Sequence, residues 1–123
     1  MPRAPKKFPA LQLRLKFASS IAFGPGKAEL LQHIADTGSI SAAARNMAMS
    51  YKRAWQLVDE MNRLFRKPLV TTAAGGAQGG GAALTPDGTT ILESYRAIQR
   101  LTAAATKREV AKMARMARGA AVP

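Results

Sequence analysis

The chain has 123 residues, 47% of them hydrophobic, and its 19 Lys and Arg against 7 Asp and Glu give a formal net charge of +12. This length suits one small domain with one core, and the charge favours a polyanionic partner because phosphate contacts release counterions. The chain has no cysteine and a single histidine (His33), which argues against disulfides and against metal or cofactor sites. It has no signal peptide and no apolar run of about 18 residues, which argues against membrane insertion, so we expect a cytoplasmic, nucleoid-associated protein.

The N-terminal third predicts an arm, a strand and a helix. Residues 1–10 hold Arg and Lys among prolines and are expected to form a flexible basic arm. Residues 11–17 alternate Leu or Phe with polar residues, which predicts a strand with one buried face and one positively charged face. Gly and Pro at 24–26 break the chain before a helix predicted over 27–37, and Gly38 is expected to end that helix as a left-handed cap.

Residues 39–63 predict two short helices joined by a tight turn at 47–49. We expect Ser41 to cap the first helix, in which the alanines at 42–44 allow a second helix to approach closely. Ser50 precedes the second helix, where its hydroxyl can accept a hydrogen bond from an unpaired amide of the first turn. This arrangement is typical of a helix-turn-helix.

The second helix, expected over 51–65, has two contrasting faces. Apolar residues recur at three- and four-residue spacing on the first face: Ala54, Leu57, Val58, Met61, Leu64 and Phe65. The opposite face carries Lys52, Arg53, Gln56, Glu60 and Arg63. Cations near the N-terminus of a helix suit the major groove of DNA, where Arg and Lys match acceptors and Gln matches a mixed edge. The alternative is an ordinary surface helix; the preceding helix and the net charge favour nucleic acid.

Carboxylates offer no catalytic pair. Asp59 and Glu60 are adjacent on the predicted helix, so their side chains diverge instead of sharing a substrate. We therefore expect a protein that is not an enzyme.

A glycine-rich hairpin is predicted after the second helix. Residues 69–72 are rich in β-formers, and glycines at 75–81 separate them from a second strand over 82–85, which suggests a hairpin with a long, loose tip. A phosphate-binding loop is the alternative, but no Gly-Lys-Ser/Thr follows. No Lys or Arg occurs between positions 67 and 96, so the tip is expected to touch phosphates through backbone amides alone.

A long helix is predicted to start at Thr85, with Pro86 in its first turn and Asp87 favoured by the helix dipole. Its apolar side is expected to pair with a second copy, whereas the alternative is packing on its own domain. The predicted dimerisation residues are Ile91, Tyr95, Ile98, Leu101 and Ala105. Residues 106–123 form a basic tail expected to be helical on DNA and frayed without it, which leaves 11–105 as the folded domain.

Several segments together resemble the N-terminal DNA-binding domain of the ModE family of molybdate-responsive transcriptional regulators. They are residues 23–27 (FGPGK), 37–45 (TGSISAAAR), 49–55 (MSYKRAW), the glycine-rich hairpin and 84–86 (LTP). The resemblance spans roughly residues 17–100, and its SAAA and LTP segments are similar, more loosely, to LysR-type regulators. It implies a dimeric bacterial protein that binds operator DNA, with Ser50, Tyr51, Lys52, Arg53 and Gln56 on its recognition helix.

The resemblance and the residue patterns together predict a mainly α fold with a small β wing, a winged helix-turn-helix with a long C-terminal dimerisation helix. In full-length family members the molybdate sites lie in C-terminal domains, so molybdate binding is not expected in this chain. The predicted function is sequence-specific regulation of transcription on double-stranded DNA; the alternative is a nucleoid-associated or RNA-binding basic protein. The predicted DNA-binding residues are Ser41, Ser50, Tyr51, Lys52, Arg53, Gln56 and Arg63.

Overall fold

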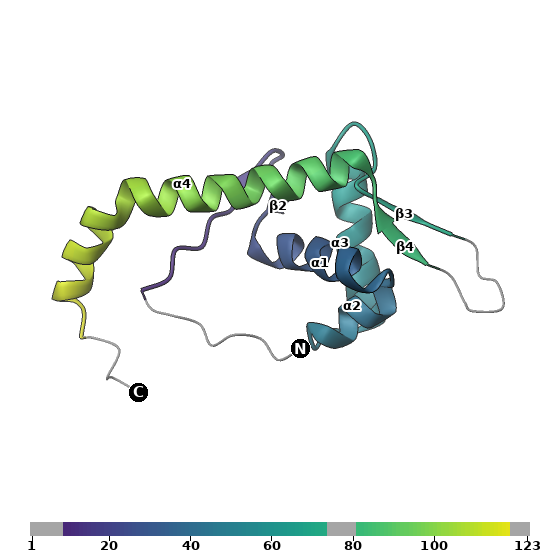
Figure 1. Ribbon diagram of the computed structural model, residues 1–123, viewed down its shortest axis with the longest axis horizontal. Coiled ribbons are helices and arrows are strands. Elements are labelled where there is room, and N and C mark those ends of the chain that lie inside the picture. The colour runs from purple at the N-terminus through teal and green to yellow at the C-terminus, as the bar shows by residue number, and fades with distance from the viewer. Residues whose placement is uncertain (1–8, 74–80, 119–123) are drawn as a thin grey trace.

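The computed structural model describes residues 9–73 and 81–118, and over these ranges the chain is mainly helical with two small sheets. A three-helix unit carries a hairpin wing at one end, and the long helix α4 lies across it (Figure 1). The predicted fold class is confirmed. In chain order the elements are β1 (Leu15–Lys16), β2 (Ala22–Phe23), α1 (Pro25–Thr37), α2 (Ile40–Asn46), α3 (Tyr51–Leu64), β3 (Val70–Thr72), β4 (Ala82–Leu84) and α4 (Pro86–Met116).

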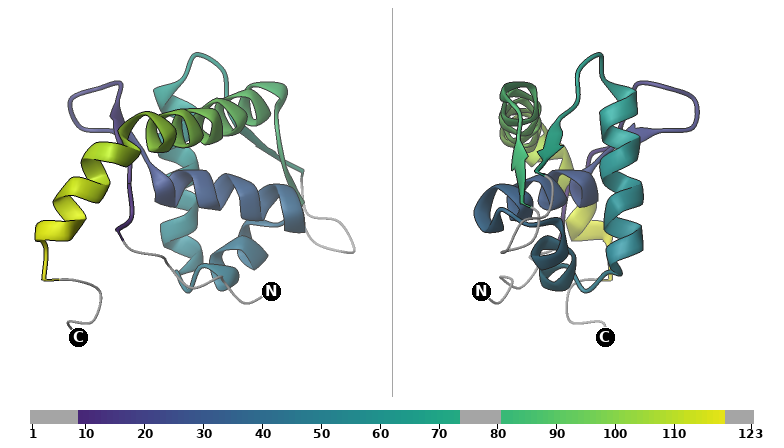
Figure 2. Two further views of the ribbon diagram at one scale, coloured as in Figure 1. Left: turned by 60° about the vertical axis from the view of Figure 1, so that its left-hand side comes forward. Right: turned by 90° about the vertical axis from the view of Figure 1, so that its right-hand side faces the viewer.

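The central helix is α1, which packs against α2, α3, β4 and the first turns of α4 (Figure 2). It starts at Pro25, earlier than expected, because the fixed φ of proline suits the first helical position. It ends at Gly38, whose φ of 69° is left-handed and whose N–H donates to the carbonyl of Ile34 at 2.8 Å. The predicted glycine cap is therefore confirmed.

The cap of α2 is Ser39 and not Ser41. Ser39 is extended, and its hydroxyl accepts a hydrogen bond from the amide of Ala42 at 3.0 Å. The helix begins at Ile40, which is drawn into the core, and this places Ser41 inside the first turn, so the prediction that Ser41 caps the helix is wrong. The turn to α3 contains Ala48 at a φ of 53°, an uncommon left-handed conformation for a residue other than glycine.

The start of α3 agrees with the prediction. The Ser50 hydroxyl accepts a hydrogen bond from the amide of Arg53 at 3.0 Å and caps the helix. Four members of the predicted apolar face are buried, whereas Leu64 and Phe65 at the C-terminal end are only half-buried. The buried residues of α3 are Ala54, Leu57, Val58 and Met61.

The predicted N-terminal strand is much shorter than expected. Only Leu15–Lys16 pairs, antiparallel, with Ala22–Phe23, and the preceding residues run beside α4, where the carbonyl of Leu13 accepts a hydrogen bond from the hydroxyl of Tyr95 at 2.6 Å. The predicted buried face also fails at its ends, because Leu11 and Phe17 are exposed. The alternation of apolar and polar residues could not show that this segment lies beside a helix, α4, and not beside a second long strand.

The wing is a two-stranded antiparallel hairpin in which Val70 pairs with Leu84 and Thr72 with Ala82. The base of the predicted hairpin is confirmed; the glycines at 75, 76, 79 and 80 lie outside the described residues. Asn62 of α3 holds the wing against α3 through hydrogen bonds. Its side chain accepts from the amides of Leu69 (2.8 Å) and Val70 (3.1 Å) and donates to the carbonyl of Val70 (3.1 Å).

Helix α4 starts as predicted, with the Thr85 hydroxyl accepting from the amide of Gly88 at 2.9 Å and Pro86 in the first turn. It then runs without interruption to Met116, so the boundary expected at 105/106 falls inside a helix. Figure 1 shows the helix bending towards its C-terminal end. In this part Thr106 donates its hydroxyl hydrogen bond to the carbonyl of Thr102 at 2.7 Å, an interaction that often accompanies a bend.

Candidate nucleic-acid interface

One side of α3 faces solvent along its whole length. Four exposed residues at spacings of four, three and four lie on this side of the helix. We call them the outward face: Lys52, Gln56, Asp59 and Arg63. Arg53 is also exposed, on the flank that continues to Glu60. The amides of the first turn, at the positive end of the helix dipole, add to the attraction of this end for anions. The sequence prediction that Lys52, Arg53 and Gln56 point away from the core is confirmed.

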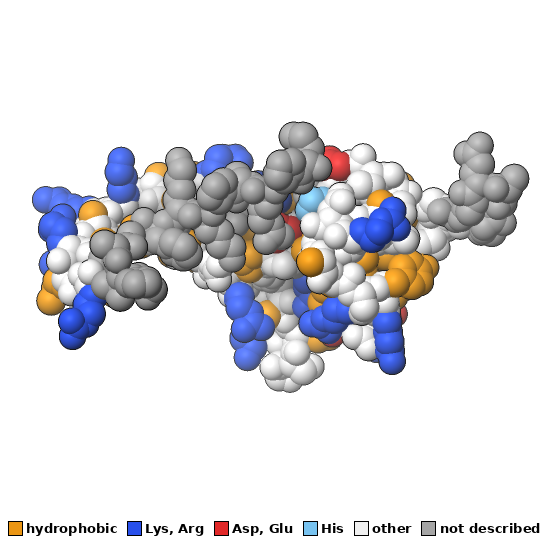
Figure 3. Space-filling view, turned by 90° about the horizontal axis from the view of Figure 1, so that it is seen from below, with side chains coloured by type: hydrophobic (Ala, Val, Ile, Leu, Met, Phe, Trp, Pro, Cys, Tyr) orange, Lys and Arg blue, Asp and Glu red, His pale blue; other side chains and the backbone are white. Residues whose placement is uncertain are grey.

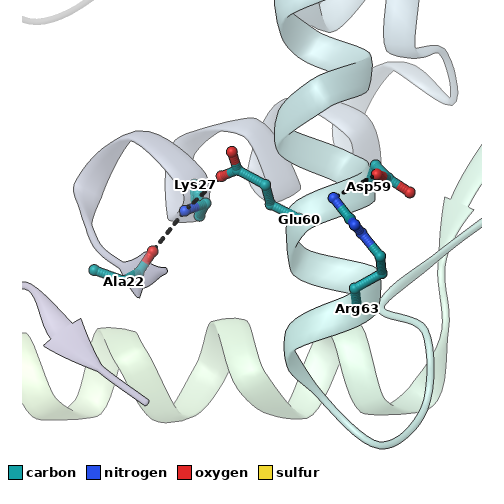
Figure 4. Close-up of polar contacts among 5 residues, drawn as sticks. All are labelled: Ala22, Lys27, Asp59, Glu60 and Arg63. Carbon is teal, nitrogen blue, oxygen red and sulfur yellow. Dashed lines mark hydrogen bonds and ion pairs between the residues drawn. The ribbon is translucent and has the colours of Figure 1, made fainter. Parts of the chain in front are cut away.

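The flank of α3 towards α1 is fixed by a half-buried cation. The ammonium of Lys27 lies 3.1 Å from a carboxylate oxygen of Glu60 and donates to the carbonyl of Ala22 at 2.6 Å (Figure 4). The Lys27 side chain is 12% exposed and that of Glu60 33%. Glu60, predicted on the solvent-facing side, is therefore a half-buried anchor. The pattern within α3 could not reveal this because the partner comes from another helix.

The C-terminal part of the outward face carries an ion pair. The guanidinium of Arg63 lies 2.9 Å from a carboxylate oxygen of Asp59, one turn earlier, and both side chains are mostly exposed (Figure 4). An exposed pair of this kind contributes about 0.2–1 kcal/mol, so Arg63 can exchange Asp59 for a phosphate at little cost. Asp59, absent from the predicted site, adds an acceptor of the kind that suits the amino group of cytosine.

The two predicted serines have structural partners. The Ser50 hydroxyl caps α3, and that of Ser41 accepts a hydrogen bond from the guanidinium of Arg45 at 3.1 Å. Each hydroxyl keeps a hydrogen that can be donated. Ser41 lies in the first turn of α2 and Ser50 directly before α3, and Ser41 borders the same open space as Tyr51 of α3.

An aromatic pair lies on the flank of α3 towards the wing. Tyr51 is 55% exposed and Trp55 is 37% exposed, and their rings meet edge to face with centroids 6.2 Å apart. Tyr51 was predicted as a DNA-binding residue, whereas Trp55 was not. The sequence signal that could have identified Trp55 was its position four residues after Tyr51 and off the apolar face of the helix.

Lys and Arg side chains stand out from the side of the molecule seen in Figure 3, both over the helix-turn-helix and over the C-terminal end of α4. Hydrophobic side chains lie among them. Within ranges 9–73 and 81–118, no group of three or more His, Asp or Glu is placed to hold a metal ion. No helix in the described part of the chain is long and apolar enough to cross a membrane. The Lys and Arg side chains on this side of the molecule suit an anionic partner.

The predicted dimerisation stripe on α4 divides into two parts. Tyr95 is 2% exposed and contacts Phe23 at a centroid distance of 5.2 Å, and burial raises its pKa more than the charge of Arg96 lowers it. It belongs to the core of its own chain, which corrects its placement at a contact between copies. Ile91 and Ile98 are half-buried, whereas Leu101 and Ala105 are exposed.

Comparisons with known proteins agree with this geometry. Residues 26–89 match the family described as bacterial regulatory helix-turn-helix protein, lysR family. The molybdenum-pterin-binding protein MopB of Rhodobacter capsulatus is 51% identical over 76 residues, which cover 62% of this chain and 28% of that protein. The DNA-binding transcriptional dual regulator ModE of Escherichia coli K12 is 43% identical over 83 residues, which cover 68% and 32%.

Among solved structures, the full-length regulator LysG of Corynebacterium glutamicum with bound effector Arg aligns with a TM-score of 0.54 at 20% identity, over 76% of this chain and 30% of that one. This likeness supports the fold. The chain spans 28–32% of the length of MopB and ModE. It belongs to the lysR family of bacterial regulatory helix-turn-helix proteins, and its resemblance to ModE-type regulators is confirmed.

Proposed function

We propose that this member of the lysR family regulates transcription by binding a specific sequence of double-stranded DNA, with α3 in the major groove. The observation that carries the proposal is the opposition of two sides of α3: Ala54, Leu57 and Val58 are buried while Lys52 and Gln56 are exposed. A helix placed this way presents its cations and its amide to base edges without any change in the core.

Base recognition is assigned to the N-terminal half of the outward face. Lys52 suits the acceptors of guanine, and Gln56 suits the paired donor and acceptor of adenine. Arg53, on the flank of α3, and Arg63, about two turns beyond Gln56 on the outward face, suit phosphates or guanine. A protein that only neutralised phosphates would need Lys and Arg alone, so Gln56 among cations favours sequence specificity.

A homodimer is the second part of the proposal. Beyond the domain core, α4 exposes large apolar side chains, with Leu101 70% and Met113 72% exposed. A second copy covering this part of α4 would remove apolar area from water and place two recognition helices about a two-fold axis. The expected target is then a pair of half-sites related by inverted symmetry, on the bacterial nucleoid.

The test uses a duplex selected from a random library by the wild-type protein and a scrambled duplex of the same composition. Gln56→Ala should weaken binding to the selected duplex by about 1–3 kcal/mol and leave the scrambled duplex nearly unaffected. Lys112→Ala, on the exposed C-terminal part of α4, is the matched control and should affect both duplexes alike.

A nucleoid-associated or RNA-binding role is the second candidate, favoured by the net charge of +12 and by the cations of the C-terminal part of α4. It predicts that selection yields no common sequence, that Gln56→Ala leaves the affinity for every nucleic acid nearly unchanged, and that Lys112→Ala weakens binding to all of them alike. The same affinity measurements therefore decide between the two candidates.

A further inference from the structure

A hollow of about 320 Å³ lies between α3, the start of α2 and the base of the wing. Tyr51 and Trp55 form its wall on α3, and Ser39 and Ser41 border it on α2. The wall on the wing includes Thr72, next to small residues of both strands. The two helices of the helix-turn-helix and the wing thus meet around one open space beside the outward face.

The chemistry of this hollow differs from that of its surroundings. Its lining, taken over the residues that the structure describes, contains hydroxyls, backbone groups and aromatic rings and no Lys, Arg, Asp or Glu. A small free anion would find no charged partner there. Hydroxyls and backbone amides do bind phosphate oxygens when the phosphate belongs to a strand that is held elsewhere by cations.

The two aromatic rings are shaped for contact. Trp55 is the single tryptophan of the chain, and the residue is 37% exposed at the edge of the hollow. The edge-to-face contact with Tyr51, at an interplanar angle of 76°, restrains both rings. Rings that are already ordered lose little conformational freedom when an apolar surface, such as the carbon edge of a deoxyribose, packs on them.

The width of the hollow is set by the clamp between α3 and the wing. Asn62 joins the two elements through three hydrogen bonds to Leu69 and Val70, so the wing keeps its distance from α3. With α3 in a major groove, a sugar–phosphate strand borders the groove on each side of the helix. The hollow lies on the wing side of α3, where one of these two strands would pass.

We propose that this hollow holds one sugar–phosphate strand of the bound DNA and grips it without ionic contacts, with the Trp55 ring packed on a deoxyribose. This inference rests on the proposed function, because it takes α3 to lie in the major groove. It assigns to Trp55 a contribution to affinity that does not depend on base sequence and does not release counterions.

Salt dependence separates this contact from an ionic one. Trp55→Ala should weaken binding about tenfold on both the selected and the scrambled duplex, the size expected when part of a large apolar side chain is no longer buried in the complex. The slope of log affinity against log salt should stay at its wild-type value. Lys112→Ala is the matched control, and it should reduce the magnitude of that slope by about 0.9 for each phosphate that the variant no longer neutralises. Trp55→Phe, which keeps an apolar ring, should recover most of the affinity.

Three results would overturn the inference. The first is wild-type affinity in Trp55→Ala, and the second is a loss of affinity confined to the selected duplex, which would make Trp55 a base-reading residue. The third is a fall in the salt slope equal to that of Lys112→Ala. A wild-type chain that binds all duplexes equally would instead refute the proposed sequence specificity while leaving the contribution of Trp55 measurable on any duplex. A chain that binds no duplex would refute both proposals.

The fluorescence of Trp55 gives a second measurement on the unaltered protein. Because the chain has one tryptophan, quenching by acrylamide reports this ring alone. Bound duplex should protect Trp55 severalfold from the quencher. Unchanged quenching at saturating duplex would place the strand outside the hollow and overturn the inference, whatever the stability of the variants.

Discussion

Gly88→Ala tests whether the start of α4 is packed against the wing as closely as the structure shows. Gly88 is buried in the first turn of α4, beside the backbone of Leu69. A Cβ added at Gly88 would lie far inside the contact distance of the carbonyl oxygen of Leu69. It would also lie 3.0 Å from the carbonyl carbon and 3.3 Å from the Cα of Leu69. The obstacle is backbone, which cannot rotate away as a side chain can.

The two contributions to the free energy of unfolding have opposite signs. Alanine is favoured over glycine within a helix by about 1 kcal/mol. Against this, forcing a methyl group into packed backbone costs about 1–3 kcal/mol. The displaced Leu69 carbonyl also accepts the amide of Thr85 at 2.9 Å, and weakening that bond costs about 1 kcal/mol more. We expect a net destabilisation of about 1–3 kcal/mol.

Urea unfolding followed by circular dichroism measures this difference at a fixed protein concentration. Gly26→Ala is the matched control, because Gly26 lies in the first turn of α1 and an added Cβ there meets nothing within 4 Å. It should be neutral or stabilising by up to about 1 kcal/mol. Equal or greater stability in Gly88→Ala would refute the proposed close packing between α4 and the wing.

Four other predictions concern stability and ligand binding. Tyr95→Phe should cost about 1 kcal/mol by removing the hydrogen bond to Leu13. Burial raises the pKa of Tyr95, so the wild type keeps this advantage below the usual tyrosine pKa of about 10 and loses it as the pH rises further. The free energies of unfolding of the wild type and Tyr95→Phe, measured in urea from pH 8 to 11, should therefore converge. A difference that stays constant over this range would contradict the prediction. Ser50→Ala should lower stability by about 1 kcal/mol in urea, and an unchanged midpoint would mean that the cap contributes nothing. Lys27→Met should cost more than the exposed control Arg63→Met, for which at most about 1 kcal/mol is expected, and the reverse order would be inconsistent with the anchor on α3. Calorimetry of this chain with molybdate, tungstate and sulfate should give no heat of binding, and saturable heat would show an oxyanion site.

Local signals accounted for most of what could be predicted about the fold. The caps at Ser50 and Thr85, the glycine at Gly38 and the proline in the first turn of α4 act through bonds within a few residues, so the sequence contains all their partners. The apolar spacing of α3 likewise predicted its buried face. The choice between Ser39 and Ser41 could not be made this way, because it depended on whether Ile40 entered the core.

Contacts between distant segments could not be predicted. The pairing of Lys27 with Glu60, the clamp formed by Asn62 and the burial of Tyr95 each depend on which elements are neighbours in space. The apolar stripe of α4 shows the limit well: its period predicted a covered face, but periodicity does not say whether the cover is the same chain or another copy.

The candidate interface was predictable where charge and helix periodicity coincide, as at Lys52, Arg53 and Gln56. Trp55 and Asp59 were missed for different reasons. An aromatic ring in a helix is usually assigned to the core, and a carboxylate is unusual on a nucleic-acid surface. Their position became clear only when the wing and the ion pair with Arg63 were seen around them.

Nuclear magnetic resonance titration of the labelled chain with a selected duplex tests the central claim most directly, because each backbone amide reports separately. We expect the largest shifts at residues 50–56, in the first turns of α3. At Lys52, Arg53 and Gln56 the shifts should be much smaller with a scrambled duplex at equal concentration and moderate salt. Shifts confined to the C-terminal part of α4, or identical shifts with both duplexes, would contradict the account.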